Sequence, residues 1–306
     1  MEKVLLIGGS GSIGKAFIKQ HYDKYDFYNI SRNENHQFEL ETEFPKVTNY
    51  ISSIEDVFML DVIFDKVKPD IVIHLAAIKH IEMAQRQPIM TCKINVIGSL
   101  NVVSMCRKYK VPITVGISTD KACASEGIYG ASKYMMERCF LEANTFDTKF
   151  ALCRFANVAN SSSSIIPNWK KLRDEGLPLK VTDKRMNRMM FSLSDAARFI
   201  YRTIVECEEF FGGFIAVKTD MKAVNIYDLA KCISDDIEII GKRTSVEKFD
   251  EDLISEKELP FTHIVDDGHV YLFEEVQPEE DRLKQTFGSH NAERMTMEDI
   301  KRLIGE

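Results

Sequence analysis

The chain has 306 residues, 44% of them apolar, and a formal net charge of −7 at neutral pH. A chain of this size can bury a full core and is expected to hold one large domain and a smaller lobe. The negative charge argues against nonspecific nucleic-acid binding, and apolar runs such as Val4 to Ile7 are far too short to span a membrane.

Seven cysteines are scattered along the chain without the spacing of a zinc site or a disulfide framework. We therefore predict reduced thiols and no bound metal. Because no secretory leader precedes the first strand, we expect a cytoplasmic protein.

The first element is an apolar strand, residues 3–7, which runs into a glycine-rich turn and then a helical pattern. Glycines at such a turn let the backbone approach a pyrophosphate, whose charge then lies at the helix N-terminus. The spacing therefore predicts a dinucleotide cofactor. The residues expected to bind it here are Gly8, Gly11, Ser12, Ile13 and Gly14.

The second strand, residues 27–30, ends in Ser31 and Arg32, where an NAD site usually carries an acidic residue for the ribose 2′-hydroxyl. A hydroxyl and a guanidinium suit a 2′-phosphate instead. We therefore predict NADP as the cofactor, bound in part by these two residues. The alternative is that Arg32 is simply exposed in a loop, and residues 33–46 are expected to form such a polar loop.

Strands and helices alternate through the first half of the chain, which predicts an α/β fold with a Rossmann-type, doubly wound parallel sheet. The further elements expected there are a strand near 47–51, a helix over 54–67, a buried strand over 71–75, a long helix over about 88–109, a strand over 113–118, a helix over 129–144 and a strand over 150–154.

Small and polar residues follow the buried strand at 71–75. Ala76 and Ala77 are small, as backbone passing close to a nicotinamide ribose would require. Lys79 and His80 come next, although a histidine in such a place is more often a packing residue than a catalyst. Asn95 stands within the long helix where an apolar residue is expected, and we predict that it braces the following helix through a water.

The stretch 117–133 carries most of the proton-transfer groups. Tyr129 and Lys133 are one helical turn apart and share a face of the predicted helix. A close ammonium would lower the pKa of the phenol from about 10 and make Tyr129 a usable base. Asp120 and Lys121 come directly after Thr119 at the end of the preceding strand. The alternatives are a surface pair on the helix and an ion pair in the turn.

The alternation breaks after residue 154, where a serine-rich loop begins. We expect residues 1–160 to form the NADP-binding domain and residues 161–306 to form mainly a smaller C-terminal substrate-binding lobe, with segments of about 190–220 returning to the first domain. The elements expected there are helices over 168–175, 194–207, 225–234 and 296–304, a strand over 214–217 and an extended segment over 237–240.

Several motifs in combination resemble those of the extended short-chain dehydrogenase/reductases. They are Gly8-Gly-Ser-Gly-Ser-Ile-Gly14, Ala76-Ala-Ile-Lys79-His80, Lys93-Ile-Asn95-Val-Ile-Gly98, Ser118-Thr-Asp-Lys-Ala122 and Tyr129-Gly-Ala-Ser-Lys133. Their order is similar to that of the inverting UDP-N-acetylglucosamine 4,6-dehydratases, a polysaccharide-biosynthesis family. Segments 154–158, 181–188 and 240–248 resemble that family's substrate-binding segments. The resemblance implies a homo-oligomer and a nucleotide-sugar substrate contacted by Lys79, His80, Asn157, Arg185, Arg188 and Arg243.

The resemblance also implies a lyase reaction in which the cofactor is recycled. Tyr129, aided by Lys133 and also in contact with NADP, would take the O4 proton while C4 passes hydride to NADP. Lys121 would remove H5, provided that its pKa is lowered from about 10.4. Asp120 would protonate the departing 6-hydroxyl, and Thr119 would orient the 4-hydroxyl.

The segment from Ala124 to Gly127 departs from the family, which usually carries an asparagine–proline–threonine–asparagine run there. This leaves open a second hypothesis, that the protein is an NADPH-dependent 4-reductase or epimerase of a 4-keto-6-deoxy nucleotide sugar. A non-catalytic NADP-binding regulatory protein is disfavoured, because the whole proton-transfer set is retained.

Overall fold

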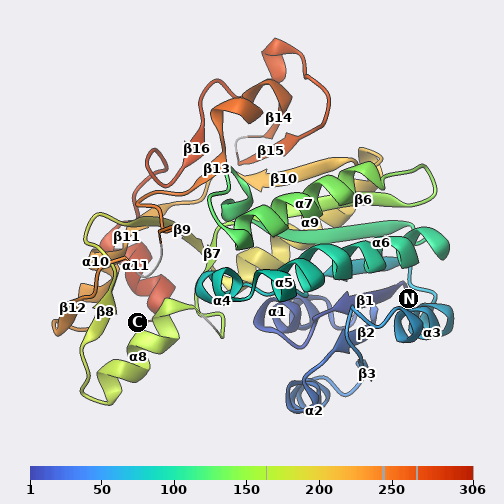
Figure 1. Ribbon diagram of the computed structural model, residues 1–306, viewed down its shortest axis with the longest axis horizontal. Helices are drawn as coiled ribbons and strands as arrows, with labels where there is room; N and C mark the ends of the chain where they lie inside the picture. Colours follow the sequence, from blue (N-terminus) through green and yellow to red (C-terminus); the bar gives the residue numbers. More distant parts are fainter. Residues whose placement is uncertain (163, 243–244, 267, 306) are drawn as a thin grey trace.

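The computed structural model describes residues 1–162, 164–242, 245–266 and 268–305 (Figure 1). Within these residues, the largest sheet has nine strands in the order β14-β15-β10-β6-β5-β4-β1-β2-β3. Neighbouring strands pair in parallel except for the two pairs that β15 forms with β10 and β14. The predicted Rossmann-type α/β class is therefore confirmed, with an antiparallel extension at one edge.

The strands of this sheet are short, and the strands at its centre are buried. β5 is buried along its whole length, as expected of a strand covered on both faces. The bounds are β1 (Lys3–Ile7), β2 (Asp26–Ser31), β3 (Thr48–Ile51), β4 (Ile71–His74), β5 (Ile113–Thr119), β6 (Lys149–Phe155), β10 (Phe214–Lys218), β14 (Thr262–Asp266) and β15 (His269–Leu272).

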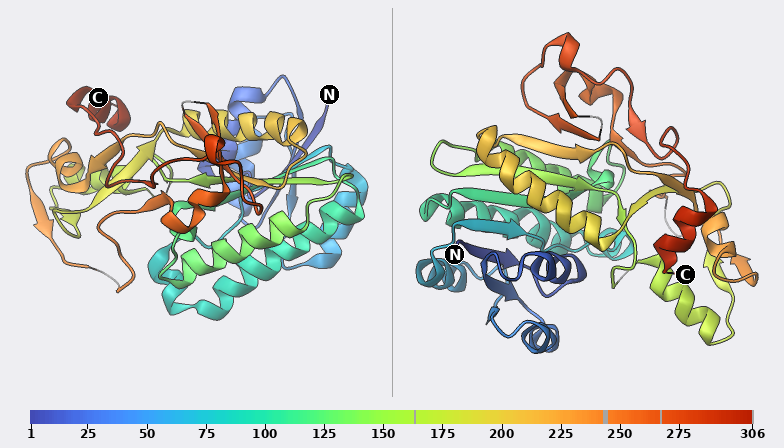
Figure 2. Two further views of the ribbon diagram at one scale, coloured as in Figure 1. Left: turned by 90° about the horizontal axis from the view of Figure 1, so that it is seen from above. Right: turned by 180° about the vertical axis from the view of Figure 1, so that it is seen from behind.

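Helices cover both faces of the sheet, with α6 and α7 on one side and α1 and α9 on the other (Figure 2). The helices that accompany the sheet are α1 (Ser12–His21), α2 (Glu34–Glu43), α3 (Val57–Val67), α4 (Ile81–Arg86), α5 (Pro88–Cys92), α6 (Ser99–Lys108), α7 (Ile128–Glu142) and α9 (Leu193–Glu209). A π-helical segment, η1 (Lys93–Gly98), joins α5 to α6, and a short 3₁₀ turn, η2 (Asp120–Ala122), follows β5.

The polar loop expected at 33–46 is wrong, because most of this segment forms helix α2. The side chain of Asn33 accepts a hydrogen bond from the backbone N–H of His36 and caps the helix. Gln37 and Leu40 are buried against the sheet. The cap and the burial of one helical turn thus stabilise a helix here, although most residues of the segment are polar.

The remaining elements form a smaller lobe beside the carboxyl ends of the central strands (Figure 1). Its own core contains Trp169, Leu229 and Ile300. The elements are α8 (Ile165–Asp174), α10 (Ile226–Lys231), α11 (Met297–Ile304), β7 (Asn157–Val158), β8 (Leu179–Val181), β9 (Asn187–Phe191), β11 (Ala223–Asn225), β12 (Ile237–Ile239), β13 (Asp252–Ile254) and β16 (Phe287–Gly288), with 3₁₀ turns η3 (Glu256–Phe261) and η4 (Glu279–Asp281) nearby. The segments expected to return to the first domain are those at about 190–220. β14 and β15, which come later in the sequence, also join the large sheet.

The continuous helix Pro88–Lys108, formed by α5, η1 and α6, is longer and more apolar than the runs considered in the sequence. Among the described residues it is the one helix with the length and composition needed to cross a membrane. Half of the residues in its apolar window are buried inside the molecule, where the helix packs beside α7.

Candidate active site

The glycine-rich turn between β1 and α1 forms one wall of the site. Gly8 has a φ of +88°, and a Cβ there would lie 2.9 Å from the backbone nitrogen of Ala76, so the two segments approach closely only with glycine. Gly11 begins α1 without a side-chain cap, which leaves the helix N-terminus available to an anion. The hydroxyl of Ser12 accepts a hydrogen bond from the backbone N–H of Ser162, so the serine-rich loop contacts this turn.

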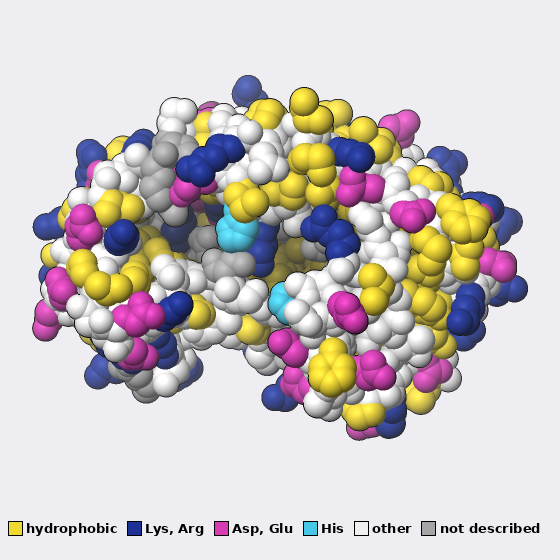
Figure 3. Space-filling view, turned by 60° about the horizontal axis from the view of Figure 1, so that its bottom comes forward, with side chains coloured by type: hydrophobic (Ala, Val, Ile, Leu, Met, Phe, Trp, Pro, Cys, Tyr) yellow, Lys and Arg dark blue, Asp and Glu magenta, His cyan; other side chains and the backbone are white. Residues whose placement is uncertain are grey.

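A cavity of about 250 Å³ lies between this turn, the carboxyl ends of β4, β5 and β6, and the start of α7. This is the edge at which open α/β sheets bind their ligands. The same face of the molecule is hollowed between the large sheet and the smaller lobe, with lysine and arginine side chains beside the hollow (Figure 3). The predicted site residues that line the cavity are Gly8, Gly11, Ser12, Ile13, Gly14, Ala77, Lys79, Thr119, Asp120, Lys121, Tyr129, Lys133 and Asn157.

Asp120 and Lys121 form a tight pair at the end of β5. The Lys121 Nζ atom lies 2.9 and 3.1 Å from the two carboxylate oxygens of Asp120, whose side chain is almost fully buried. The Thr119 hydroxyl donates a further hydrogen bond of 2.7 Å to Asp120 Oδ1. Burial favours the neutral amine of Lys121, but the carboxylates of Asp120 and Glu251 outweigh it and raise the pKa of Lys121. The lowered pKa expected for this base is therefore not what its protein surroundings produce.

Tyr129 and Lys133 both line the cavity, but their electrostatics differ from the expectation. Burial raises the pKa of Tyr129, and Lys121 and a hydrogen bond with Thr119 oppose that rise only in part. The ammonium of Lys133 instead donates to the Met136 sulfur at 3.1 Å. Burial lowers the pKa of Lys133 to about 8, against a smaller opposing effect of a nearby glutamate. The cation that acts on Tyr129 is thus Lys121. The prediction that Lys133 lowers the pKa of Tyr129 is wrong for the protein alone.

Asn95 braces the helix that carries Tyr129 and Lys133 directly rather than through a water. Its amide nitrogen lies 3.0 Å from the Ser132 hydroxyl oxygen on α7. The same amide accepts a hydrogen bond from the Ile78 N–H and donates one to the Ile78 carbonyl. Asn95 belongs to the π-helical segment η1, a type of irregularity that is frequent at functional sites.

Ser31 and Arg32 lie outside the cavity lining, at the end of β2 beside the glycine-rich turn. The Ser31 hydroxyl accepts hydrogen bonds from Ser10 and Gln37 at 3.0 and 2.9 Å. Arg32 is exposed, and its charge is one of several that lower the pKa of Glu55, the largest contribution being a hydrogen bond from Lys93. Ala76 also lies outside the lining, packed behind Gly8.

The cations of the lobe are held by protein partners. Arg185 is exposed, pairs with Asp183 at 2.9 Å and stacks over the Phe249 ring. Arg188 is largely buried and donates to three backbone carbonyls, those of Asn187, Lys248 and Phe249.

The other residues expected to contact the substrate are placed differently. Lys79 reaches the cavity, where partial burial lowers the pKa of its amine. His80 is exposed at the start of α4 and does not line the cavity. Arg243 lies outside the described residues.

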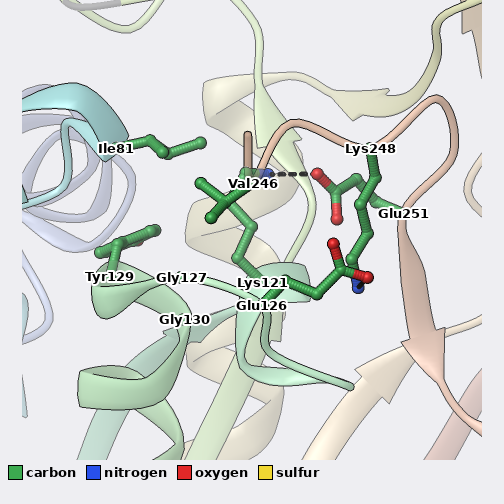
Figure 4. A pocket seen from close by; sticks show the side chains of 9 residues that line it. All are labelled: Ile81, Lys121, Glu126, Gly127, Tyr129, Gly130, Val246, Lys248 and Glu251. Atoms are coloured by element: carbon green, nitrogen blue, oxygen red, sulfur yellow. Dashed lines mark ion pairs between the residues drawn. The ribbon is translucent and has the colours of Figure 1, made fainter. Parts of the chain in front are cut away.

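A smaller pocket beside Tyr129 contains residues that the sequence did not indicate. It is lined by Ile81, Lys121, Glu126, Gly127, Tyr129, Gly130, Val246, Lys248 and Glu251 (Figure 4). The Glu251 carboxylate lies 3.9 Å from Lys121 Nζ. Lys248 donates to the Ala124 carbonyl at 2.7 Å and pairs with Glu126. The lobe brings Val246, Lys248 and Glu251 to this pocket from far along the chain, and Glu251 lies outside the segments that the sequence indicated.

Comparison with known proteins identifies the family. A family model described as polysaccharide biosynthesis protein matches residues 4–271. The chain is 34% identical to the inverting UDP-N-acetylglucosamine 4,6-dehydratase of Campylobacter jejuni, over 86% of this chain and 80% of that protein. It is 28% identical to the UDP-glucose 4-epimerase of Rickettsia massiliae, over 99% of this chain and 96% of that protein.

Among solved structures, the X-ray structure of Pen from Bacillus thuringiensis matches 99% of this chain and 96% of its own, with a TM-score of 0.90 and 26% identity. These matches confirm the resemblance that the motifs indicated. The chain belongs to the polysaccharide biosynthesis protein family, within the extended short-chain dehydrogenase/reductases.

Proposed function

We propose that the protein is an NADP-dependent nucleotide-sugar 4,6-dehydratase. Its substrate would be UDP-N-acetylglucosamine or a close relative, oxidised at C4, dehydrated across C5 and C6 and reduced at C6. The observation that carries this proposal is the hydrogen-bonded pair Asp120–Lys121 in the same cavity as Tyr129. Loss of water needs an acid and a base beyond the group that serves C4 oxidation, and this pair supplies both.

The residues around the glycine-rich turn fit a dinucleotide. The close approach of Gly8 to Ala76 and the uncapped start of α1 leave backbone N–H groups for a pyrophosphate. Ser31 and Arg32 would hold the 2′-phosphate, and Lys133 would face the nicotinamide ribose. When bound, the cofactor would accept hydride from C4 and return it to C6.

The chain's own groups divide the proton transfers. Tyr129 would take the O4 proton, with Thr119 orienting that hydroxyl and Lys121 supplying positive charge. Transfer of one proton from Lys121 Nζ to Asp120, along the existing 2.9 Å hydrogen bond, gives a neutral amine and a carboxylic acid. The amine can then remove H5, and the acid can protonate the 6-hydroxyl as it leaves as water.

The substrate would lie between the cavity and the lobe. Lys79 and Asn157 line the cavity and would contact the sugar. Arg185 has an exposed side chain within reach of solvent and is a better candidate for the diphosphate than Arg188, whose guanidinium is engaged by carbonyls. His80 and Arg243 remain predicted contacts.

A second candidate function is a 4-epimerase or 4-reductase. It is favoured by the match to a UDP-glucose 4-epimerase over nearly the full length of both chains. Such a reaction uses Tyr129 and Lys133 but does not require Asp120 to act as an acid.

The test is to incubate the purified protein with UDP-N-acetylglucosamine and to read the C6 methyl and the C5 configuration of the product by NMR. We expect a 6-deoxy-4-keto product without net consumption of NADPH. Asp120→Asn should stop loss of the 6-hydroxyl and accumulate bound reduced cofactor. Asp147→Asn is a matched control, because Asp147 pairs with Lys110 at an exposed site. Stoichiometric NADPH consumption on a 4-keto substrate, with Asp120→Asn nearly as active as wild type, would favour the reductase.

We also propose a cytoplasmic homo-oligomer that needs neither nucleic acid nor membrane as a partner. The half-buried state of the helix Pro88–Lys108, which packs beside α7, supports a packing role for it rather than a membrane span.

A further inference from the structure

Glu251 places a buried carboxylate at the junction between the lobe and the turn η2, which carries Asp120 and Lys121. It comes just before β13 and is only 4% exposed. Its backbone is fixed on both sides by Ser289: the Glu251 N–H donates to the Ser289 hydroxyl at 3.0 Å, and the Ser289 N–H donates to the Glu251 carbonyl at 2.8 Å. The side chain therefore projects from a fixed point into the smaller pocket, where it faces Lys121 (dashed line in Figure 4).

The carboxylate of Glu251 lies between two cations at nearly equal distances. Lys121 Nζ is 3.9 Å from its Oε1 atom, and the Arg188 guanidinium is 3.8 Å from the same atom. Asp120, Lys121, Glu251 and Arg188 thus form a row of alternating charge. Within the part of the chain that the structure describes, the Glu251 carboxylate takes part in these ion pairs but in no hydrogen bond, so it acts on Lys121 through charge.

A buried carboxylate is costly unless a cation compensates it. Here the hydrogen bonds of Lys121 go to Asp120, and Glu251 adds a second negative charge 3.9 Å from the ammonium. We propose that Glu251 is a positioning residue that shares the Lys121 ammonium with Asp120 and controls when Lys121 can give up its proton. This inference deepens the proposed dehydratase function and rests on it.

The groups that face Lys121 come from four elements. Asp120 is its neighbour in η2, Tyr129 comes from α7, Arg188 from β9, and Glu251 from the segment before β13. Lys248 and Arg188 also act on Glu251, whose pKa burial raises. Once Lys121 passes its proton to Asp120, Glu251 keeps Arg188 as a partner, so the row stays compensated. Glu251 therefore favours the protonated form of Lys121. When the proton moves to Asp120, Glu251 still has Arg188 as a partner.

Removal of the Glu251 charge should make Lys121 easier to deprotonate. The experiment is an NMR titration of the protein labelled with lysine carrying ¹³C at Cε, with the Lys121 signal assigned by its loss in Lys121→Met. In Glu251→Gln we expect the titration midpoint of Lys121 to fall by about one pH unit or more, since a charge within 4 Å is lost. Glu251→Asp keeps the charge but draws it back from Lys121 by one methylene group, so the Lys121 midpoint should fall by a smaller amount. Glu126→Gln is the control, because that more exposed carboxylate pairs with Lys248.

A shift in Glu251→Gln no larger than that in Glu126→Gln would overturn the proposal. If Glu251→Gln does not fold, the comparison of Glu251→Asp with wild type decides: a downward shift supports the role, and an unchanged midpoint overturns it. This titration needs no substrate, so it stays decisive even if the dehydratase function is wrong.

The second readout is exchange of H5 with deuterated solvent as a function of pH. In Glu251→Gln, the pH at which exchange becomes half-maximal should move down by the same amount as the Lys121 midpoint. A purely structural role for Glu251 would reduce exchange at every pH and leave its half-maximal pH unchanged, which would overturn the proposal. Absence of both exchange and reduced cofactor in the wild type would instead refute the dehydratase function.

Discussion

The side-chain amide of Asn95 donates a 3.0 Å hydrogen bond to the hydroxyl of Ser132, the residue before Lys133. Through its second set of hydrogen bonds, the same amide holds both backbone groups of Ile78. Asn95 is fully buried. One side chain therefore fixes helix α7 to the segment that follows β4.

Asn95→Ala should lower both stability and activity. The substitution removes the partner of both Ile78 backbone groups and the donor to the Ser132 hydroxyl, which keeps its own hydrogen bond to the Tyr129 carbonyl. We expect the free energy of unfolding to fall by about 2–3 kcal/mol. Urea denaturation measures this loss. Asn101→Ala is the control, because the Asn101 amide donates one 2.9 Å hydrogen bond to Ile54 in the same helical layer, away from the cavity. Equal losses in the two variants would contradict a special role for Asn95.

Gly130→Ala should separate helix α7 from the turn that carries Asp120 and Lys121. A Cβ at position 130 would lie 2.0 Å from the Lys121 carbonyl oxygen, so the helix or the turn must move. We expect turnover to fall by at least about tenfold, as small misplacements of catalytic groups are costly. Ala131→Ser, at the exposed neighbouring position, should keep turnover close to wild type. Unchanged turnover in Gly130→Ala would show that the close packing has no catalytic importance.

The central sheet and the cavity could be predicted from the sequence because their signals are local. The glycine-rich turn follows an apolar strand directly, and Asp120, Lys121, Tyr129 and Lys133 lie within one strand–turn–helix unit. The start of α9 could also be predicted, because Ser192 and Asp195 form a capping box.

The rest depended on contacts between distant segments. The lobe strands β7, β9 and β11 are two to five residues long and form one small sheet, so their sequences carry little periodicity. The charges around Lys121 include Glu251 and Arg188, which the lobe supplies. The electrostatics of the site therefore could not be derived from the stretch 117–133 alone.

Arg32→Ala should weaken NADP binding far more than NAD binding. Arg32 is exposed at the end of β2 and would make a charge-assisted contact with the 2′-phosphate, which NAD lacks. We expect the Kd for NADP to rise about tenfold or more while the Kd for NAD changes less than about twofold. Isothermal titration calorimetry with both cofactors measures the ratio. Arg107→Ala, at another exposed arginine, is the control; equal losses for both cofactors in Arg32→Ala would refute the assignment.

Homo-oligomer formation should depend on the exposed apolar face of two adjacent helical segments. Ile97 on η1 is 54% exposed and Met135 on α7 is 51% exposed. Because half of the apolar window of the helix Pro88–Lys108 is already buried inside the molecule, a second copy of the chain is a better partner for the face than lipid. Ile97→Lys with Met135→Lys should yield a monomer by sedimentation velocity, whereas Val205→Lys on α9 should not. A wild-type monomer would refute the oligomer outright.

Lys133 should make the stability of the protein rise in mildly alkaline solution. Burial lowers its pKa from 10.5 to about 8, so between these values the unfolded chain binds more protons than the folded protein. Stability must then increase with pH through this window, because the folded state no longer holds an unfavourable buried charge. Integration from pH 7 to pH 10 gives a gain of about 2.5 kcal/mol for this residue. Lys133→Met lacks the titrating group and should lack this part of the gain. Urea denaturation of both proteins at several pH values isolates it from other groups, and parallel curves for the two proteins would show that Lys133 does not titrate in this range.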